Sequence, residues 1–484
     1  MGKPPDHAPG SGPAQRSWST LRKSNLRFRR IHAIRGRRID LSRPLMADPL
    51  PLPSFPTLRE AVRYWLRLGC ISFGGPAGQI AIMHHELVEQ RRWISHRHFL
   101  EALNFCMLLP GPEAQQLATY LGWRLHGWRG GVAAGTLFVL PSVFILFALS
   151  WLFMAGGHLP WLTGLFYGLT AAVIAIVAEA VLRIGKKALR SPSLWALAGL
   201  SFTAIYFFNI SFILILLGAA LTGWLGHRRN PRQFPGSGGH GSSPASPDEA
   251  PALALPPAPA ASWRRSATIL TVCLSLWWLP IFAAGLWLGW QSTAFHQGVF
   301  FSKAAMVTFG GAYAVLPYVA QQAVDHYQWL SHAQMMSGLA LAETTPGPLI
   351  MVLQFVGFAG GWQHPGTLTP LAGATLGALL TTWATFLPCF LWVFLGAPHV
   401  GALHQRPALS AALTAITAAV VGVILNLGVT FVQHALRPVA GGPIDWFIAI
   451  LALAAFLALQ RFKLPLLPVM ACCALAGMAR HLAF

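Results

Sequence analysis

One stretch of this sequence occurs twice, 236 residues apart, and it limits the possible folds more than any other feature. Each copy contains Phe-Gly-Gly, Trp, Ser and Pro-Gly-Pro in the same order and at the same spacing. The copies are Phe73-Gly74-Gly75, Trp93, Ser95 and Pro110-Gly111-Pro112, and Phe309-Gly310-Gly311, Trp329, Ser331 and Pro346-Gly347-Pro348. A period this long exceeds the units of about 20 to 50 residues that solenoids repeat. It indicates a duplicated membrane domain instead.

The composition supports a membrane protein. Only 10% of the 484 residues are charged, whereas soluble domains carry about 25% charged residues. The mean hydropathy is +0.54. Continuous apolar runs cover residues 131–155 and 193–225, and a run of about 20 residues is long enough for a membrane-spanning helix. Strands of membrane barrels alternate over only about 10 residues, so we expect an all-α integral membrane protein.

Hydropathy predicts about 13 transmembrane helices in the order six, one, six. The first repeat covers residues 58–226, and the second covers residues 295–484. Within the first, residues 193–208 and 210–226 are either two helices with a tight turn at Asn209 or one long helix. A single linking helix is expected within residues 265–294. Residues 1–57, which are basic and Pro-rich, are expected to form a disordered cytoplasmic N-terminus, and residues 227–264 a flexible Gly/Ser/Pro/Ala-rich linker.

An odd number of helices between the two copies places the second copy upside down, so we expect inverted halves. Most Lys and Arg residues fall in loops that this topology assigns to the cytoplasm, as the positive-inside rule requires. The loops at residues 84–98 and 434–444 disagree, although the first agrees if the Gly-Gly and Pro-Gly-Pro segments are re-entrant. This topology places the N-terminus in the cytoplasm and the C-terminus outside an inner (plasma) membrane.

The formal net charge of +20 would indicate nucleic acid binding in a soluble protein. Here residues 1–45 contain 11 of the Lys and Arg residues, which favours contact with anionic lipid over a DNA-binding arm. An alternative is that Met46 is the natural start and that residues 1–45 have no role.

The two motifs predict an anion-binding site. Proline and glycine destabilise helices, so Gly74-Gly75, Gly310-Gly311 and the two Pro-Gly-Pro segments are expected to break them. Broken helices expose free N–H groups at their N-termini, and these groups attract anions. The alternative for each motif is a kink that serves only packing.

Two basic residues share the same repeat. Arg67 and Lys303 each lie six residues before a Phe-Gly-Gly. A charge within an apolar run is costly and usually functional, so both are expected to bind an anion, although Arg67 could instead extend to the membrane surface.

Two carboxylates lie next to the Pro-Gly-Pro motifs. Glu113 follows the first motif, and Glu343, Thr344 and Thr345 precede the second. We expect Thr344 and Thr345 at the substrate site. Glu113 and Glu343 either carry coupling protons or pair with Arg67 or Lys303 as structural ion pairs. Four amide side chains either donate to an oxyanion or join helices: Asn104, Gln115, Gln116 and Gln354.

The sequence contains no pattern for an enzyme, a cofactor or a metal. No P-loop motif occurs, and His84-His85-Glu86 lacks the second histidine of a zinc-protease motif. The six cysteines have no C-x-x-C spacing and indicate neither a disulfide framework nor a zinc site.

The paired motifs resemble the chromate ion transporter family in its long, two-domain form. The resemblance runs from about residue 58 to 483 and includes "CISFGGPAGQ", "LLPGPEAQQL", "VTFGGAYAVL" and "AETTPGPLIM". It implies a secondary transporter that exports chromate from the cytoplasm and gives chromate resistance. The long basic N-terminus and the extended linker depart from the family pattern.

Other functions remain open at this stage. A carrier or channel for sulfate or another tetrahedral oxyanion is the main alternative, because sulfate shares the charge and shape of chromate. A membrane-embedded enzyme and an oxyanion receptor are two others. The sequence is also compatible with a homodimer.

Overall fold

The computed structural model describes residues 55–73, 75–157, 159–234, 262–400, 407–437 and 442–483. Gly74, nearly all of the predicted N-terminal segment 1–57 and most of the predicted linker 227–264 lie outside these residues. Residues 52–484 form one compact unit by their contacts.

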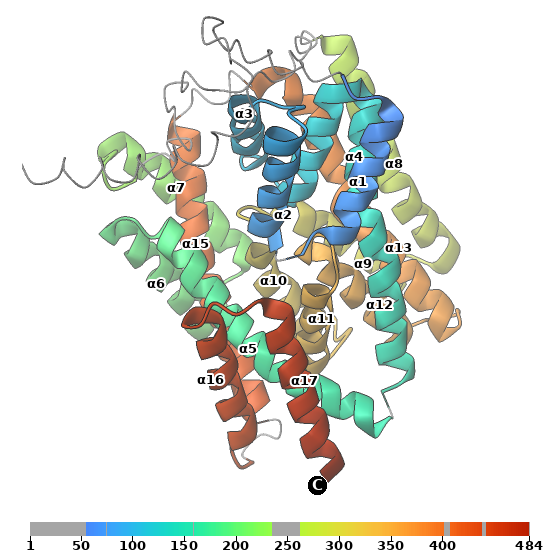
Figure 1. The fold of residues 1–484 in the computed structure, drawn as a ribbon, viewed down its shortest axis with the longest axis vertical. Helices are drawn as coiled ribbons and strands as arrows, with labels where there is room; N and C mark the ends of the chain where they lie inside the picture. Colours follow the sequence, from blue (N-terminus) through green and yellow to red (C-terminus); the bar gives the residue numbers. More distant parts are fainter. Residues whose placement is uncertain are drawn as a thin grey trace, which may run out of the picture. The chain divides into compact units, whose positions relative to one another are not determined.

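The described residues fold into helices alone (Figure 1). Those of the first repeat are α1 (Leu58–Ile71), α2 (Gly75–His84), the π-helix η2 (His85–Gln90), α3 (His96–Cys106), α4 (Glu113–Ala155), α5 (Pro160–Ala188), α6 (Pro192–Phe208) and α7 (Phe212–Arg229). The link between the repeats contains α8 (Trp263–Leu288). Those of the second repeat are α9 (Thr293–Met306), α10 (Ala312–Ala320), η3 (Gln321–His326), α11 (His332–Thr344), η4 (Leu349–Met351), α12 (Val352–Gln363), α13 (Pro370–Gly396), η5 (Ala397–His399), α15 (Pro407–Leu436), α16 (Trp446–Gln460) and α17 (Leu466–Ala483).

The two copies of the duplicated stretch have the same local structure. The π-helices η2 and η3 begin 236 residues apart, at His85 and Gln321. Two residues after each π-helix the backbone enters the left-handed region, at Arg92 with φ 54° and Gln328 with φ 53°. Ser95 and Ser331 then cap α3 and α11 by accepting a backbone N–H three residues later. The duplication therefore extends from sequence to backbone conformation.

Both motifs end helices, as the proline and glycine content predicts. Phe-Gly-Gly separates α1 from α2 and α9 from α10, and Pro-Gly-Pro separates α3 from α4 and α11 from η4. Gly75 and Gly311 have φ of 70° and 93°, and Gly111 and Gly347 have φ of 128° and 115°. These conformations are strained for residues that carry a Cβ. The turn expected at Asn209 is also confirmed, since this residue ends α6 in the left-handed conformation.

Each Pro-Gly-Pro leads into a pair of tightly packed helices. In the first repeat, α4 is a hairpin of two arms, because His126 and Gly127 have non-helical dihedrals. A Cβ on Gly122 would lie 2.4 Å from the Gly130 carbonyl of the other arm. In the second repeat, α12 and α13 form the equivalent pair, and a Cβ on Gly357 would lie 2.6 Å from the Gly377 carbonyl. Glycine permits this close packing in both repeats.

The remaining helices of each half pack against helices of the other half. Helix α5 of the first repeat packs against α16 and α17 of the second, whereas α15 of the second repeat packs against α6 and α7 of the first (Figure 1). Small residues form both contacts: Cβ atoms on Gly168 and Gly422 would lie 2.0 Å from the carbonyls of Cys473 and Ala198. Neither repeat therefore buries its helices alone.

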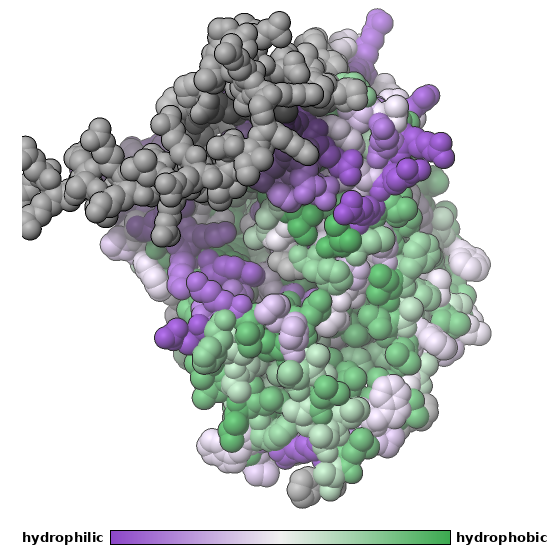
Figure 2. Space-filling model, viewed as in Figure 1, coloured by the Kyte–Doolittle hydropathy of each residue, from purple (hydrophilic) through white to green (hydrophobic). Residues whose placement is uncertain are grey.

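Six of the described helices are long and apolar enough to cross a membrane: α4, α5, α8, α13 with η5, α15 and α17. Three shorter apolar helices are α6, η4 with α12, and α16. Apolar side chains cover most of the coloured surface in Figure 2, and hydrophilic ones gather mainly toward its upper part. The chain is thus a multi-pass helical membrane protein, and the count of 13 spans stays a prediction.

Candidate functional site

The Pro-Gly-Pro motif of each half contacts the residue before the Phe-Gly-Gly of the other half. The Gly111 N–H donates to the Thr308 carbonyl at 2.7 Å, and the Gly347 N–H donates to the Ser72 carbonyl at 2.7 Å. Gly347 and Thr308 lie 236 residues after Gly111 and Ser72. The two contacts are therefore the same interaction made twice, with the halves exchanged.

A second pair of contacts follows the same exchange. Gly347 packs against Ser142 of α4, whose hydroxyl donates to the Pro346 carbonyl. Gly111 packs against Cys389 of α13. Ser142 and Cys389 each follow a proline inside a long helix. A side chain at either glycine would collide with these neighbours, so the contacts require glycine in addition to the dihedrals.

A helix of each half starts within four residues of each contact. Near Gly111 and Thr308, α4 of the first half starts at Glu113 and α10 of the second half starts at Ala312. Near Gly347 and Ser72, η4 of the second half starts at Leu349 and α2 of the first half starts at Gly75. Helix N-termini carry unpaired N–H groups and a partial positive charge. The geometry therefore suits an anion at the motifs.

Three buried glutamines of the first half surround the motifs. The Gln79 amide donates to the Gly347 carbonyl, the Gln116 amide donates to the Pro110 carbonyl at 2.7 Å, and Gln115 donates to Thr119 at 3.2 Å. Each is fully buried, and each has an Oε1 atom without a hydrogen-bond partner. A buried polar atom without a partner is costly, so these amides are suited to bind water or a polar ligand. Gln354 instead joins α12 to α4 through the Val143 carbonyl.

The carboxylate Glu343 is buried, with 7% of its surface exposed, and it accepts a hydrogen bond from the Tyr313 hydroxyl. Glu113 is half-buried at the first residue of α4. The hydroxyls of Thr344 and Thr345 donate to carbonyls of their own helix, which leaves their oxygens free only to accept.

The two predicted basic residues lie on the surface of the described molecule. Arg67 and Lys303 are both exposed. Arg67 faces Glu86, with 3.9 Å between guanidinium and carboxylate. Among the described residues, no ion pair joins either base to Glu113 or Glu343. The structure thus does not bring these bases to the carboxylates.

The bases whose charge acts on these two carboxylates come from α5. Arg183 is a charged neighbour of Glu343, together with Glu179, and Lys187 is a charged neighbour of Glu113. In the sequence, Arg183 and Lys187 belong to a basic cluster that follows an apolar run, and only the spacing of Glu179, Arg183 and Lys187 marks a single helix face. No local signal reveals what that face contacts.

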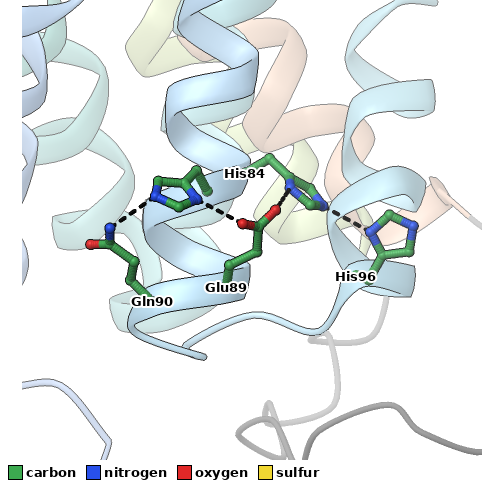
Figure 3. A network of polar contacts seen from close by, with 5 residues as sticks. His84, Glu89, Gln90 and His96 are labelled. Carbon is green, nitrogen blue, oxygen red and sulfur yellow. Dashed lines mark hydrogen bonds and ion pairs between the residues drawn. The ribbon is translucent and has the colours of Figure 1, made fainter. Parts of the chain in front are cut away.

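A polar network joins the end of α2, the π-helix η2 and the start of α3 (Figure 3). Glu89 lies between His84, at 3.1 Å, and His85, at 2.7 Å, and His84 contacts His96 at 2.8 Å. The hydrogen bond from His85 lowers the pKa of Glu89. Asp325 and His332 occupy the equivalent positions in the second half and lie 3.5 Å apart. No cluster suited to a metal ion occurs in the described ranges, so we interpret the network as structural.

Comparison with known proteins identifies the family. The sequence profile described as "Chromate transporter" matches residues 59–224 and 295–478, one segment in each repeat. The chain is 32% identical to a chromate transport protein of Cupriavidus metallidurans over 84% of this chain and 89% of that protein. It is 32% identical to one of Pseudomonas aeruginosa over 89% of this chain and 93% of that protein. A probable chromate transport protein of Synechococcus elongatus is 29% identical over 87% of this chain and 95% of its own length.

No solved structure matches this chain. The profile covers most of both repeats and includes all four motifs, which are the segments that meet in the reciprocal contacts. The chain belongs to the chromate transporter family.

Proposed function

We propose that this chain is a secondary transporter that exports chromate from the cytoplasm and thereby gives chromate resistance. The observation that carries the proposal is the pair of reciprocal contacts between Pro-Gly-Pro and Phe-Gly-Gly. They place helix N-termini from both halves beside each motif, as transporters with broken helices do at their substrate sites. We infer chromate as the substrate from the relatives that are named for chromate transport.

In this proposal the two halves are inverted and enclose one oxyanion between them. Unpaired backbone N–H groups at the helix starts beside the motifs contribute to binding, and the motif residues Gly74, Gly75, Pro110, Gly111, Pro112, Gly310, Gly311, Pro346, Gly347 and Pro348 form the surrounding turns. Arg67 and Lys303 attract the anion at the two entrances, since both are exposed. Rocking of one half against the other would alternate access.

The membrane potential supplies a driving force in the export direction. Moving one charge through an inside-negative potential of 100 mV is worth about 2.3 kcal/mol, so export of a dianion is favoured without a coupled ion. Coupling through Glu343 or Glu113 is a further element of the proposal, and it would set the stoichiometry. A carrier or channel for sulfate is the second candidate, because a site that recognises charge and shape would accept both anions.

Uptake of radiolabelled chromate into inverted membrane vesicles tests this function. We expect accumulation that depends on this protein and that collapses when the potential is removed. Right-side-out vesicles are the control for direction, and they should not accumulate chromate. Accumulation only down a chromate gradient would indicate a channel. Sulfate uptake that excess chromate does not inhibit would indicate a sulfate carrier.

A further inference from the structure

Helix α5 presents a row of charged side chains, one turn apart, to the carboxylates beside both Pro-Gly-Pro motifs. Glu179 and Arg183 form an ion pair with 3.6 Å between carboxylate and guanidinium. The Arg183 guanidinium lies 5.9 Å from the centroid of the Tyr313 ring, and the Tyr313 hydroxyl donates to Glu343. Lys187, one turn further, is a charged neighbour of Glu113. The row therefore links α5 to α10 and α11 of the other half and to the start of α4.

Arg183 differs from the other bases of this helix in its surroundings. Its side chain is 37% exposed and that of Glu179 is 24% exposed, whereas Lys186 and Lys187 are exposed. Glu343 directly precedes Thr344, Thr345 and the second Pro-Gly-Pro. Arg183 is thus a partly accessible guanidinium that is close to the motif and held by groups of both halves.

The chemistry of this cluster suits the exchange of one anion for another. A guanidinium presents paired N–H donors that match a tetrahedral oxyanion, and stacking on an aromatic ring leaves those donors at its edge. With Glu179 and Glu343 both ionised, the cluster contains two carboxylates and one guanidinium. A bound dianion would compete with these carboxylates for the positive charge of the guanidinium.

We propose that Arg183 binds the transported tetrahedral dianion, and that Glu179 and Glu343 hold its guanidinium when the anion is absent. This inference rests on the proposed function and names the residue that neutralises the substrate. Because Tyr313 and Glu343 belong to the second half and Arg183 to the first, the exchange of partners would change a contact between the halves. Binding would thereby be linked to their relative movement.

Binding of radiolabelled chromate to the purified full-length protein in lipid nanodiscs tests the role of Arg183. We expect Arg183→Gln to weaken binding about 100-fold, because a charged contact is lost. Arg183→Lys should weaken it about 10-fold, since a lysine keeps the charge without the paired donors. Lys186→Gln, an exposed change three residues away on α5, is the matched control and should bind like the wild type.

A second variant separates substrate binding from a structural role. If Arg183 only neutralises Glu343, then Arg183→Gln with Glu343→Gln removes both charges and restores binding. Substrate binding by Arg183 predicts instead that this double variant folds, by thermal stability and size-exclusion profile, and still binds chromate about 100-fold more weakly than the wild type. Restored binding in the double variant, or Arg183→Gln binding within about threefold of wild type, would overturn the inference.

The same experiments distinguish this inference from the proposed function. If the wild-type protein transports chromate and the Arg183→Gln protein transports it equally well, only the assignment of Arg183 is wrong. Wild-type protein that neither binds nor transports chromate removes the proposed function, and the inference with it.

Discussion

Gly111 and Gly347 occupy backbone positions that residues with a side chain rarely adopt. Their φ angles are 128° and 115°, and a Cβ on Gly347 would lie 1.7 Å from the Ser142 hydroxyl. We expect Gly347→Ala to lower stability through backbone strain of about 1 to 3 kcal/mol and through the collision with Ser142. The apparent melting temperature of the purified protein measures this loss.

The reciprocal contacts supply the control. Ser142→Gly removes the colliding hydroxyl, so it should partly restore Gly347→Ala while leaving the backbone strain. It should not restore Gly111→Ala, because the neighbours of Gly111 are Cys389 and Gln116. Equal rescue of both alanine variants by Ser142→Gly would contradict the pairing of each motif with the opposite half.

At the scale of residues, the sequence predicts conformation better than contacts. Proline and glycine act through their own backbone, so the helix ends at both motifs follow from the motif alone. The neighbour of a charge depends on tertiary packing, which no local pattern contains. Arg67 and Lys303 share a repeat position yet lie on the surface, whereas Arg183 meets Tyr313 from 130 residues away in the chain.

At the scale of elements, the start of α11 meets the end of α15 at two histidine rings that are tilted by 33° to each other. The rings of His332 and His434 lie 3.7 Å apart. Burial, assisted by the neighbouring His434, lowers the pKa of His332 below the usual 6.5, against the opposing effect of Asp325. A lowered pKa means that the folded state disfavours the protonated ring. This stabilisation is complete above pH 6.5 and is lost as the pH falls toward the lower folded value.

We therefore expect the start of α11 and the end of α15 to become more mobile below about pH 6.5. Hydrogen exchange of these segments, corrected for the intrinsic effect of pH, measures the change. His332→Phe is the matched variant, since it keeps an aromatic ring against His434 and cannot titrate. If the pH dependence persists in His332→Phe, another group causes it.

The elements themselves were partly predictable. Hydropathy places the apolar segments, but it treats residues 58–83 and 295–320 as continuous, because glycine and serine hardly interrupt an apolar run. The structure divides each run into two shorter helices, and a π-helix follows the second of them directly. π-Helices have no strong sequence signature, so η2 and η3 could not be expected.

At the scale of the whole molecule, the duplication appears as a pseudo-two-fold relation between the halves. The motif contacts and the exchange of α5 with α15 both repeat when the halves are interchanged. Sequence periodicity predicts two similar halves, but it does not show that they are interwoven, because the packing partners are distant in the chain. Inversion makes one further prediction: the pseudo-two-fold axis lies in the plane of the membrane, so the two halves have opposite orientations across it.

Cysteine labelling tests that orientation. Arg67 and Lys303 are equivalent, exposed positions, so inverted halves present them to opposite sides of the membrane, whereas parallel halves present them to the same side. The experiment places Arg67→Cys or Lys303→Cys in a protein whose six cysteines are replaced, and applies a membrane-impermeant maleimide to right-side-out and inverted vesicles. A cysteine at exposed Lys186, in the basic segment expected in the cytoplasm, is the reference for sidedness.

We expect Arg67→Cys to react in the same vesicles as the Lys186 reference, and Lys303→Cys to react in the opposite ones. Reaction of both from one side would contradict inversion and leave a parallel duplication. Reaction of neither would contradict their proposed place at water-accessible entrances. Inverted halves can exchange conformations, which turns an outward-facing state into an inward-facing one, whereas parallel halves cannot. The labelling result therefore also decides whether an exchange of conformations between the halves can alternate access in this protein.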